Sequence, residues 1–216
     1  MFGRRIVSSA LVALTIGCAS NASAAVIYNE ASSGDFSGAG LTPTAVGALS
    51  PGSNQIFGST GNVGGSDRDY FSLLVPAGYV LAAIIELPGT QSGNLSFMGL
   101  EEGPQLTLPT NTATAAGLLG WLHYSPADIN SNVLARMSIP SMGSSGFTLP
   151  LHAGTYTFWV QDTTPGTFAY GFDLQVVPEP ATAALVLLGL AASAMSRRRS
   201  VHSPSPARRV GRGDRT

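Results

Sequence analysis

The most regular feature of the chain is a strict alternation of apolar and polar positions near its C-terminal end. Single small or polar residues separate the apolar side chains of Phe168, Tyr170, Phe172, Leu174 and Val176. A period of two over this length is typical of a strand with one buried face. The same spacing occurs just before it, at Tyr156, Phe158 and Val160, and a turn at 162–166 separates the two runs. The pattern predicts that these two strands form a hairpin.

Shorter strands are predicted earlier in the chain. Residues 71–75 alternate, residues 76–78 form a Pro-Ala-Gly turn, and residues 79–87 are apolar on both faces. Leu95 and Phe97 indicate another strand, edge strands are expected near 26–28 and 55–57, and one short helix is expected at 128–137. Many short strands between glycine and proline turns are typical of an all-β fold. The sequence therefore predicts an antiparallel β-sandwich or jelly roll.

The N-terminal end has the three parts of a secretory signal peptide. Arg4 and Arg5 precede an apolar run at 6–16, and Ala22-Ser23-Ala24 forms an A-x-A cleavage site. These features predict that a signal peptidase removes residues 1–24. In an alternative reading Cys18 is the lipidated first residue of a lipoprotein, but Thr15 stands where that signal needs an aliphatic residue.

The C-terminal end combines a stiff motif, an apolar run and a basic cluster. Pro178 and Pro180 fix their own φ angles and favour extended geometry at Val177 and Glu179. Residues 181–195 are uncharged and favour a helix, which reaches the ~17-residue minimum for a membrane span only with Pro180 and Ser196 included. The positive-inside rule places the basic cluster on the cytoplasmic side; it consists of Arg197, Arg198 and Arg199. Residues 200–216, rich in Arg, Ser, Pro and Gly, are predicted to be a disordered basic tail.

Residues 25–177 between these ends are long enough for one domain with its own core. They contain no cysteine, and two arginines stand against ten acidic residues, a net charge of −8. An acidic surface disfavours nucleic acid and anionic lipid as partners and suits divalent cations. Outside the two ends, the composition is that of a soluble exported domain.

No catalytic motif stands out in this exported domain. His123 and His152 are its only histidines, and neither an H-E-x-x-H zinc motif nor a G-x-S-x-G nucleophile elbow is present. These absences predict a non-enzymatic protein and make a hydrolase with an unrecognised site the weakest hypothesis. The aromatic run at 121–124 has two interpretations, an exposed patch on which a sugar ring stacks or part of the core.

The best candidate for a metal site is Asp67 with Asp69. Two carboxylates at i and i+2 after a glycine-rich turn can converge on calcium, which prefers six to eight oxygen ligands. Asp162 and Asp173 would add oxygens if the fold brought them close. In the alternative, Arg68 neutralises both acids in a solvated turn, and no cofactor is needed.

The tripartite C-terminal end resembles the PEP-CTERM sorting signal of bacteria that produce exopolysaccharide. The resemblance implies that an exosortase, a membrane-embedded protease, cuts near Pro178-Glu179-Pro180 after the chain has crossed the inner membrane. The protein is then expected to be anchored transiently before it reaches the cell surface or extracellular matrix, with exopolysaccharide as a further candidate partner. Members of this family usually end soon after the basic cluster, whereas this chain continues to Thr216.

A second resemblance covers residues 55–177. The run from Gly61 to Phe71, the Pro76-Ala77-Gly78 turn and Ala153-Gly154-Thr155-Tyr156 are similar to the bacterial pre-peptidase C-terminal domain. That resemblance implies a small β-sandwich that often binds calcium or carbohydrate and has no chemistry of its own. The alternative function is therefore a calcium- or polysaccharide-binding module held by an uncleaved C-terminal anchor.

Overall fold

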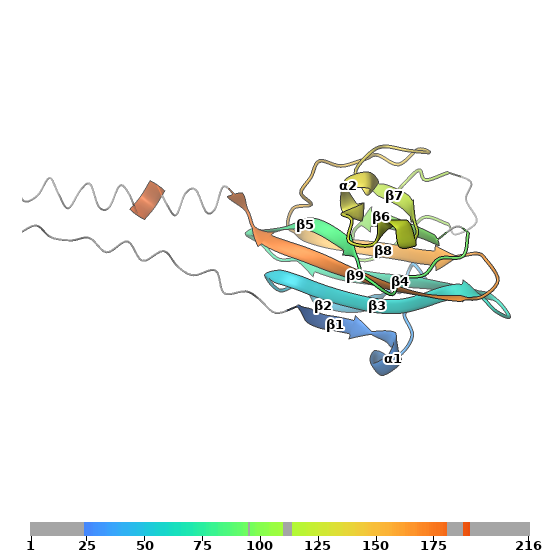
Figure 1. Ribbon diagram of the computed structural model, residues 1–216. Coiled ribbons are helices and arrows are strands. Elements are labelled where there is room, and N and C mark those ends of the chain that lie inside the picture. Colours follow the sequence, from blue (N-terminus) through green and yellow to red (C-terminus); the bar gives the residue numbers. More distant parts are fainter. Residues whose placement is uncertain (1–23, 95, 110–113, 181–187, 191–216) are drawn as a thin grey trace, which may run out of the picture.

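The computed structural model describes residues 24–94, 96–109, 114–180 and 188–190. It shows a curled, mostly antiparallel sheet that closes on itself into two layers (Figure 1). In chain order the elements are β1 (Ala25–Asn29), α1 (Glu30–Ser33), β2 (Thr44–Ala48), β3 (Gly52–Asn62), β4 (Ser66–Val75), β5 (Tyr79–Glu86), β6 (Ser96–Glu102), β7 (Gly120–Tyr124), the 3-10 turn η1 (Pro126–Asp128), α2 (Val133–Met137), β8 (Gly154–Asp162) and β9 (Thr167–Pro178).

The two layers meet at the turn between β3 and β4. These strands pair only at that turn, where Gly61 lies opposite Asp67 and Asn62 opposite Ser66. Beyond it, the strand order is β5-β9-β3-β1 in one layer and β2-β4-β8-β6-β7 in the other. The predicted antiparallel sandwich is confirmed, and the edge pairs β1–β3 and β2–β4 add two parallel pairings that the sequence did not indicate.

The core lies between the layers and consists of the apolar positions that alternate in the sequence. All but one of the inward residues predicted for β4, β8 and β9 are buried; they are Phe71, Leu73, Val75, Tyr156, Phe158, Val160, Tyr170, Phe172, Leu174 and Val176. The exception, Phe168 at the start of β9, is only half-buried. Between the layers, the rings of Tyr124 and Phe172 meet edge to face with centroids 5.3 Å apart. Aromatic contacts of this kind add to the burial of apolar area in holding the layers together.

The predicted hairpin of the last two strands is wrong. β8 pairs with β4 and β6, whereas β9 pairs with β3 and β5 in the opposite layer. The connection between Asp162 and Thr167 therefore crosses from one layer to the other. The alternation shows which face of a strand is buried, and that face is the same in both arrangements.

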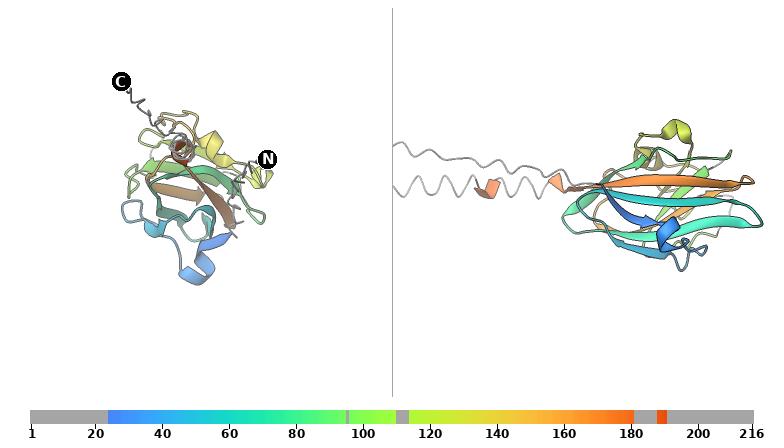
Figure 2. Two further views of the ribbon diagram at one scale, coloured as in Figure 1. Left: turned by 90° about the vertical axis from the view of Figure 1, so that its left-hand side faces the viewer. Right: turned by 60° about the horizontal axis from the view of Figure 1, so that its bottom comes forward.

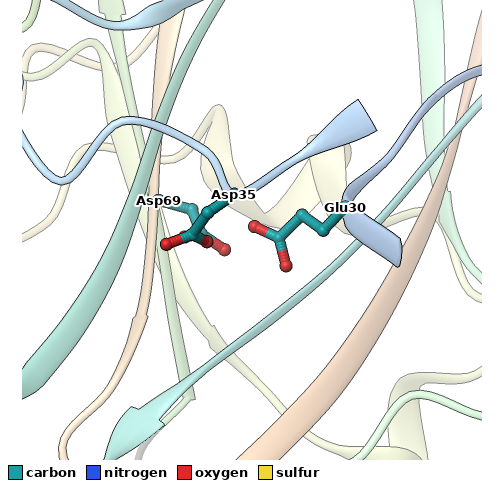
Figure 3. Close-up of side chains that lie close together, drawn as sticks. All are labelled: Glu30, Asp35 and Asp69. Atoms are coloured by element: carbon teal, nitrogen blue, oxygen red, sulfur yellow. The ribbon is translucent and has the colours of Figure 1, made fainter. Parts of the chain in front are cut away.

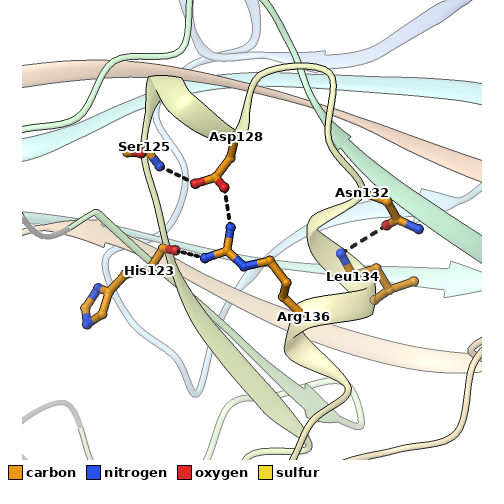
Figure 4. Close-up of polar contacts among 6 residues, drawn as sticks. All are labelled: His123, Ser125, Asp128, Asn132, Leu134 and Arg136. Atoms are coloured by element: carbon orange, nitrogen blue, oxygen red, sulfur yellow. Dashed lines mark hydrogen bonds and ion pairs between the residues drawn. The ribbon is translucent and has the colours of Figure 1, made fainter.

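A short helical segment covers the side where β5 and β7 would leave the core open. The expected helix at 128–137 is present only in part, as η1 and the five-residue helix α2. Asn132 Oδ1 accepts hydrogen bonds from the N–H groups of Leu134 and Ile84, 3.1 Å and 3.2 Å away, and so caps α2 and fixes it to β5. The guanidinium of Arg136 bonds Asp128 and the carbonyl of His123, which ties the segment to β7 (Figure 4).

The first residues of β1 and the last residues of β9 lie at the same end of the sandwich (Figure 2). Ala24, on one side of the expected signal cleavage, is exposed. Several predicted features lie outside the described residues: Ala22, Cys18, Leu95, most of the apolar helix at 181–195, the tail at 200–216, and Arg197, Arg198 and Arg199. No helix in the described part of the chain has the length and hydrophobicity to cross a membrane.

Candidate functional site

Three carboxylates from separate segments converge, with Asp35 exposed, Glu30 half-buried and Asp69 buried. Glu30 is the first residue of α1, Asp35 follows that helix, and Asp69 lies in β4. One oxygen of each lies within 4.8 Å of one oxygen of both others, and Figure 3 shows the three groups pointing toward a common centre. We call Glu30, Asp35 and Asp69 the acidic cluster.

Local sequence explains why Glu30 and Asp35 meet. Asn29 Oδ1 caps α1 by accepting from the N–H of Ala31, and Gly34 ends this single turn at φ 92°, which favours glycine. Phe36 then anchors the segment in the core, with its ring 4.2 Å from that of Tyr28 and 5.0 Å from that of Phe71. The turn and the anchor together bring Asp35 back over β4.

Asp69 is fully buried, and only one of its two carboxylate oxygens has a hydrogen-bond partner. Its Oδ2 accepts a hydrogen bond of 2.7 Å from the hydroxyl of Tyr170, while Oδ1 has no hydrogen-bond partner. Glu30 is held in place by backbone donors, the N–H of Phe36 at 3.2 Å and that of Ser59 at 2.7 Å. One buried oxygen therefore remains available for a ligand.

Two acids of this cluster, Asp69 and Glu30, resist ionisation when nothing neutralises them. Burial raises the pKa of Asp69 to about 9, and the charge of Glu30 contributes to the increase. Burial and the neighbouring Asp35 raise the pKa of Glu30 to about 7, although its backbone hydrogen bonds oppose this. No arginine or histidine forms an ion pair with the three acids within the described ranges. A bound cation would remove this electrostatic cost.

The cluster offers hard oxygen ligands, the chemistry that calcium prefers. Three carboxylates supply at most part of a calcium shell, so water would have to complete it. The metal site predicted from the sequence was Asp67 with Asp69, and the structure groups Asp69 with Glu30 and Asp35 instead. Arg68 forms no ion pair with Asp67 or Asp69 in the described part of the chain, and its Nε donates to Gln161 Oε1 over 3.1 Å.

The other two acids considered as ligands are bonded elsewhere, Asp162 to loop residues and to Ser96, and Asp173 to the neighbouring strand β3. Asp162 accepts from the Ser96 hydroxyl at 2.6 Å and from the N–H groups of Gly93 and Thr164, both at 2.8 Å. Burial alone would raise the pKa of Asp162, but these hydrogen bonds outweigh it and lower the pKa. Asp173 accepts from the hydroxyl of Ser53 at 2.6 Å. Neither belongs to the acidic cluster.

The aromatic run at 121–124 is divided between two environments. Leu122 and Tyr124 point into the core, while Trp121 and His123 lie on the outer face of the sheet. There Trp121 and Phe97 stack with centroids 5.9 Å apart beside a cavity of about 190 Å³. The core interpretation therefore holds for Leu122 and Tyr124, whereas sugar stacking at the outward-facing Trp121 stays a prediction.

The motif Val177-Pro178-Glu179-Pro180 begins within the last strand. Pro178 is the final residue of β9 and lies opposite Tyr79 of β5. The N–H of Glu179 donates to the carbonyl of Gly78 over 2.9 Å, and its carboxylate lies 3.6 Å from Nδ1 of His152. The other histidine of the domain, His123, lies elsewhere, with Nδ1 3.1 Å from the carbonyl of Ser96.

Residues 176–200 match the family model of the PEP-CTERM protein-sorting motif. The matched range includes the Pro-Glu-Pro motif, the apolar run and Arg197, Arg198 and Arg199, as the sequence predicted. A search of curated proteins found no match. The sandwich lies almost entirely outside the matched range, so its resemblance to the pre-peptidase C-terminal domain stays a prediction.

Proposed function

Because the chain carries a PEP-CTERM sorting motif, which implies export, processing by a membrane exosortase and sorting to the cell surface, we propose that the sandwich is a non-enzymatic protein of the cell surface or extracellular matrix. In this proposal the exosortase cuts near Pro178-Glu179-Pro180 and releases the domain from a transient anchor. Residues 1–24 are removed earlier by a signal peptidase.

The position of the motif relative to the core carries this proposal. Val176 is the last buried residue of β9, and Val177, Pro178 and Pro180 are exposed. The core cluster extends no further than Val176. Cleavage after this point removes no core residue, so the released domain keeps all of its buried apolar area.

The test is to follow the tagged protein in its host, with and without the exosortase gene. The expected result is a loss of mass and a change of location that depend on the exosortase and disappear when Pro178, Glu179 and Pro180 are replaced by alanine. Replacing exposed Leu74 by alanine serves as the control and leaves processing unchanged. Peptides that run intact from Leu174 into the arginine cluster, as the only mature form, would contradict the proposal.

A second candidate function is binding of a divalent cation, and the acidic cluster supports it. Calcium would neutralise three acids of which one is buried with an oxygen that no donor satisfies. Calorimetry with calcium on the mature protein is expected to show one site, weakened at least tenfold by Asp69→Asn. Glu102→Gln, an exposed acid outside the cluster, is the matched control. No heat and no change in melting temperature would contradict this function.

A polysaccharide is the third class of partner that the surface supports. Trp121 is partly exposed beside the cavity on the outer face, and a flat aromatic ring can stack on a sugar. This binding would suit a protein sorted to the matrix, whether or not the anchor is removed.

A further inference from the structure

The sorting motif is attached to the folded domain through one strand only. From Phe172 to Val176, β9 lies between β3 and β5, and its pairing with β3 ends where Gly52 lies opposite Val176. Pairing with β5 continues for two more residues, with Val80 opposite Val177 and Tyr79 opposite Pro178. The beginning of the motif is thus an edge of the sheet that β5 alone holds.

Two further contacts hold Glu179 against the domain. Its N–H donates to the carbonyl of Gly78 in the turn before β5, 2.9 Å away, and its carboxylate lies 3.6 Å from the ring of His152. The position of His152 is fixed because the preceding residue, Leu151, exchanges backbone hydrogen bonds of 2.8 Å and 3.1 Å with Leu81 of β5. The side chain of Glu179, the one charged group of the motif, is therefore only 29% exposed.

We infer that the folded sandwich withholds the sorting motif, and that the end of β9 must separate from β5 before the protease can engage it. The inference rests on the proposed cleavage near Pro178-Glu179-Pro180. A protease cleft binds its substrate as an extended chain and uses the backbone groups and side chains that give specificity. In the folded domain, the N–H and the carboxylate of Glu179 are already engaged by Gly78 and His152.

The separation is local and does not require unfolding. The last core residue, Val176, stays between β3 and β5, while Val177 and Pro178 are exposed. The side chain of His152 is 72% exposed, and its contact with Glu179 is an ion pair only when the imidazole is protonated; surface pairs of this kind are weak. Ends of strands with few buried contacts open and close rapidly, and cleavage then follows the fraction of open molecules. His152 and Gly78 thus set the processing rate without touching the reacting bond.

A reversible lock tests this inference. Val80 and Val177 are register partners, and the only cysteine of the chain, Cys18, lies in the predicted signal peptide. The double variant Val80→Cys/Val177→Cys should form a disulfide after export, because oxidising compartments support such bonds. Pulse-labelling in the host is expected to show processing slowed at least tenfold, restored by dithiothreitol. The single variant Val177→Cys controls for the change in the motif, and electrophoresis without reductant verifies the bond.

A second set of variants opens the motif instead of locking it and remains informative if the cysteine pair misfolds. His152→Ala is expected to speed processing about twofold, the effect of losing a surface ion pair of roughly 0.4 kcal/mol. His152→Arg, which places a permanent cation opposite Glu179, is expected to bring the rate back to the original value or below it, and His123→Ala is the control at the other histidine.

The outcomes separate the inference from the proposed function. Equal processing of the locked and reduced forms, or slower processing of His152→Ala, would overturn the inference while the cleavage itself stands. If the protein without substitutions stays full length in the presence of the exosortase, the proposed function is overturned.

Discussion

The hydroxyl of Tyr170 donates a 2.7 Å hydrogen bond to Oδ2 of Asp69 and joins the two layers of the sandwich. Tyr170 lies in β9 and Asp69 in β4, which belong to opposite layers. The tyrosine lies opposite Gly58 of β3, where a Cβ would come within 2.4 Å of the hydroxyl oxygen. Glycine at position 58 therefore keeps open the space that this bond needs.

Removing the Tyr170 hydroxyl is expected to destabilise the domain. In Tyr170→Phe both oxygens of the buried Asp69 lack a donor, which costs about 1–3 kcal/mol of unfolding free energy. Urea denaturation of the mature protein measures this cost. Tyr79→Phe, at a half-buried tyrosine of β5, should change the free energy by less than about 0.5 kcal/mol. Equal effects of the two variants would contradict the role given to the hydroxyl.

Stability without a cation is expected to fall as the pH rises. Burial raises the pKa of Asp69 from 3.8 to about 9 and that of Glu30 from 4.5 to about 7, so the folded state keeps protons that the unfolded state releases. The stabilisation is complete below about pH 4 and is lost progressively toward pH 9. In chelator, the melting temperature should drop by about 5 °C or more from pH 5 to pH 8. Calcium should reverse most of this drop at pH 8, and Asp69→Asn should remove much of it.

Glu86, which does not belong to the acidic cluster, is expected to add a second pH-dependent contribution to stability. Its carboxylate is fully buried, neither oxygen has a hydrogen-bond partner, and burial, followed by the charge of Asp128, raises its pKa to about 7. Glu86→Gln avoids the cost of ionisation and is expected to raise the melting temperature at pH 8 but not at pH 5. Glu102→Gln on the surface should have no effect at either pH. A loss of stability at pH 8 in the first variant would show that the negative charge is needed.

Asn132 is expected to be essential for the segment that covers β5 and β7. Asn132→Ala removes the acceptor for the N–H groups of both Leu134 and Ile84 and should cost about 1–3 kcal/mol. Asn132→Asp keeps an oxygen at the same place and should retain most of the stability. Thermal unfolding of the two variants beside the parent measures the difference.

Trp121 offers a test of polysaccharide binding that is independent of the cation. Addition of the host's exopolysaccharide is expected to change tryptophan fluorescence, and Trp121→Ala should weaken binding about tenfold through loss of stacking. Leu74→Ala, an exposed apolar residue outside the cavity, is the control. An unchanged affinity for Trp121→Ala would exclude this face.

The sequence predicted the positions of the strands better than it predicted which strands pair with each other. Alternation identified the inward residues of β4, β8 and β9 because burial on one face leaves a period of two. It could not show that β8 and β9 lie in opposite layers. Strand pairing depends on contacts with segments distant in sequence, and the alternation within one strand does not indicate which segments those are. The same limit applies to β1 and β2, whose parallel pairing requires long connections that carry no pattern of their own.

For the same reason, the sequence identified only one of the three residues of the acidic cluster. Asp69 follows a glycine-rich turn and has Asp67 as a near neighbour in sequence, and these two features alone indicate a metal site. Glu30 and Asp35 reach Asp69 only through the pairing of β1 with β3 and the burial of Phe36. An acidic pair around Gly34, followed by an aromatic residue, was the one signal that could have identified them.

The shared location of the start of β1 and the end of β9 would determine which way the domain faces if its C-terminal end tethered it to a membrane. The turn at 63–65 and the connection at 163–166 lie at the far pole, since Gly61 of β3 pairs with Thr167 of β9 there. A domain tethered by its C-terminal end would stand upright with that pole turned toward the surroundings. An epitope inserted between Val63 and Gly64 would then be reachable by antibody even on the tethered precursor, and it would make the outward pole a convenient place for display.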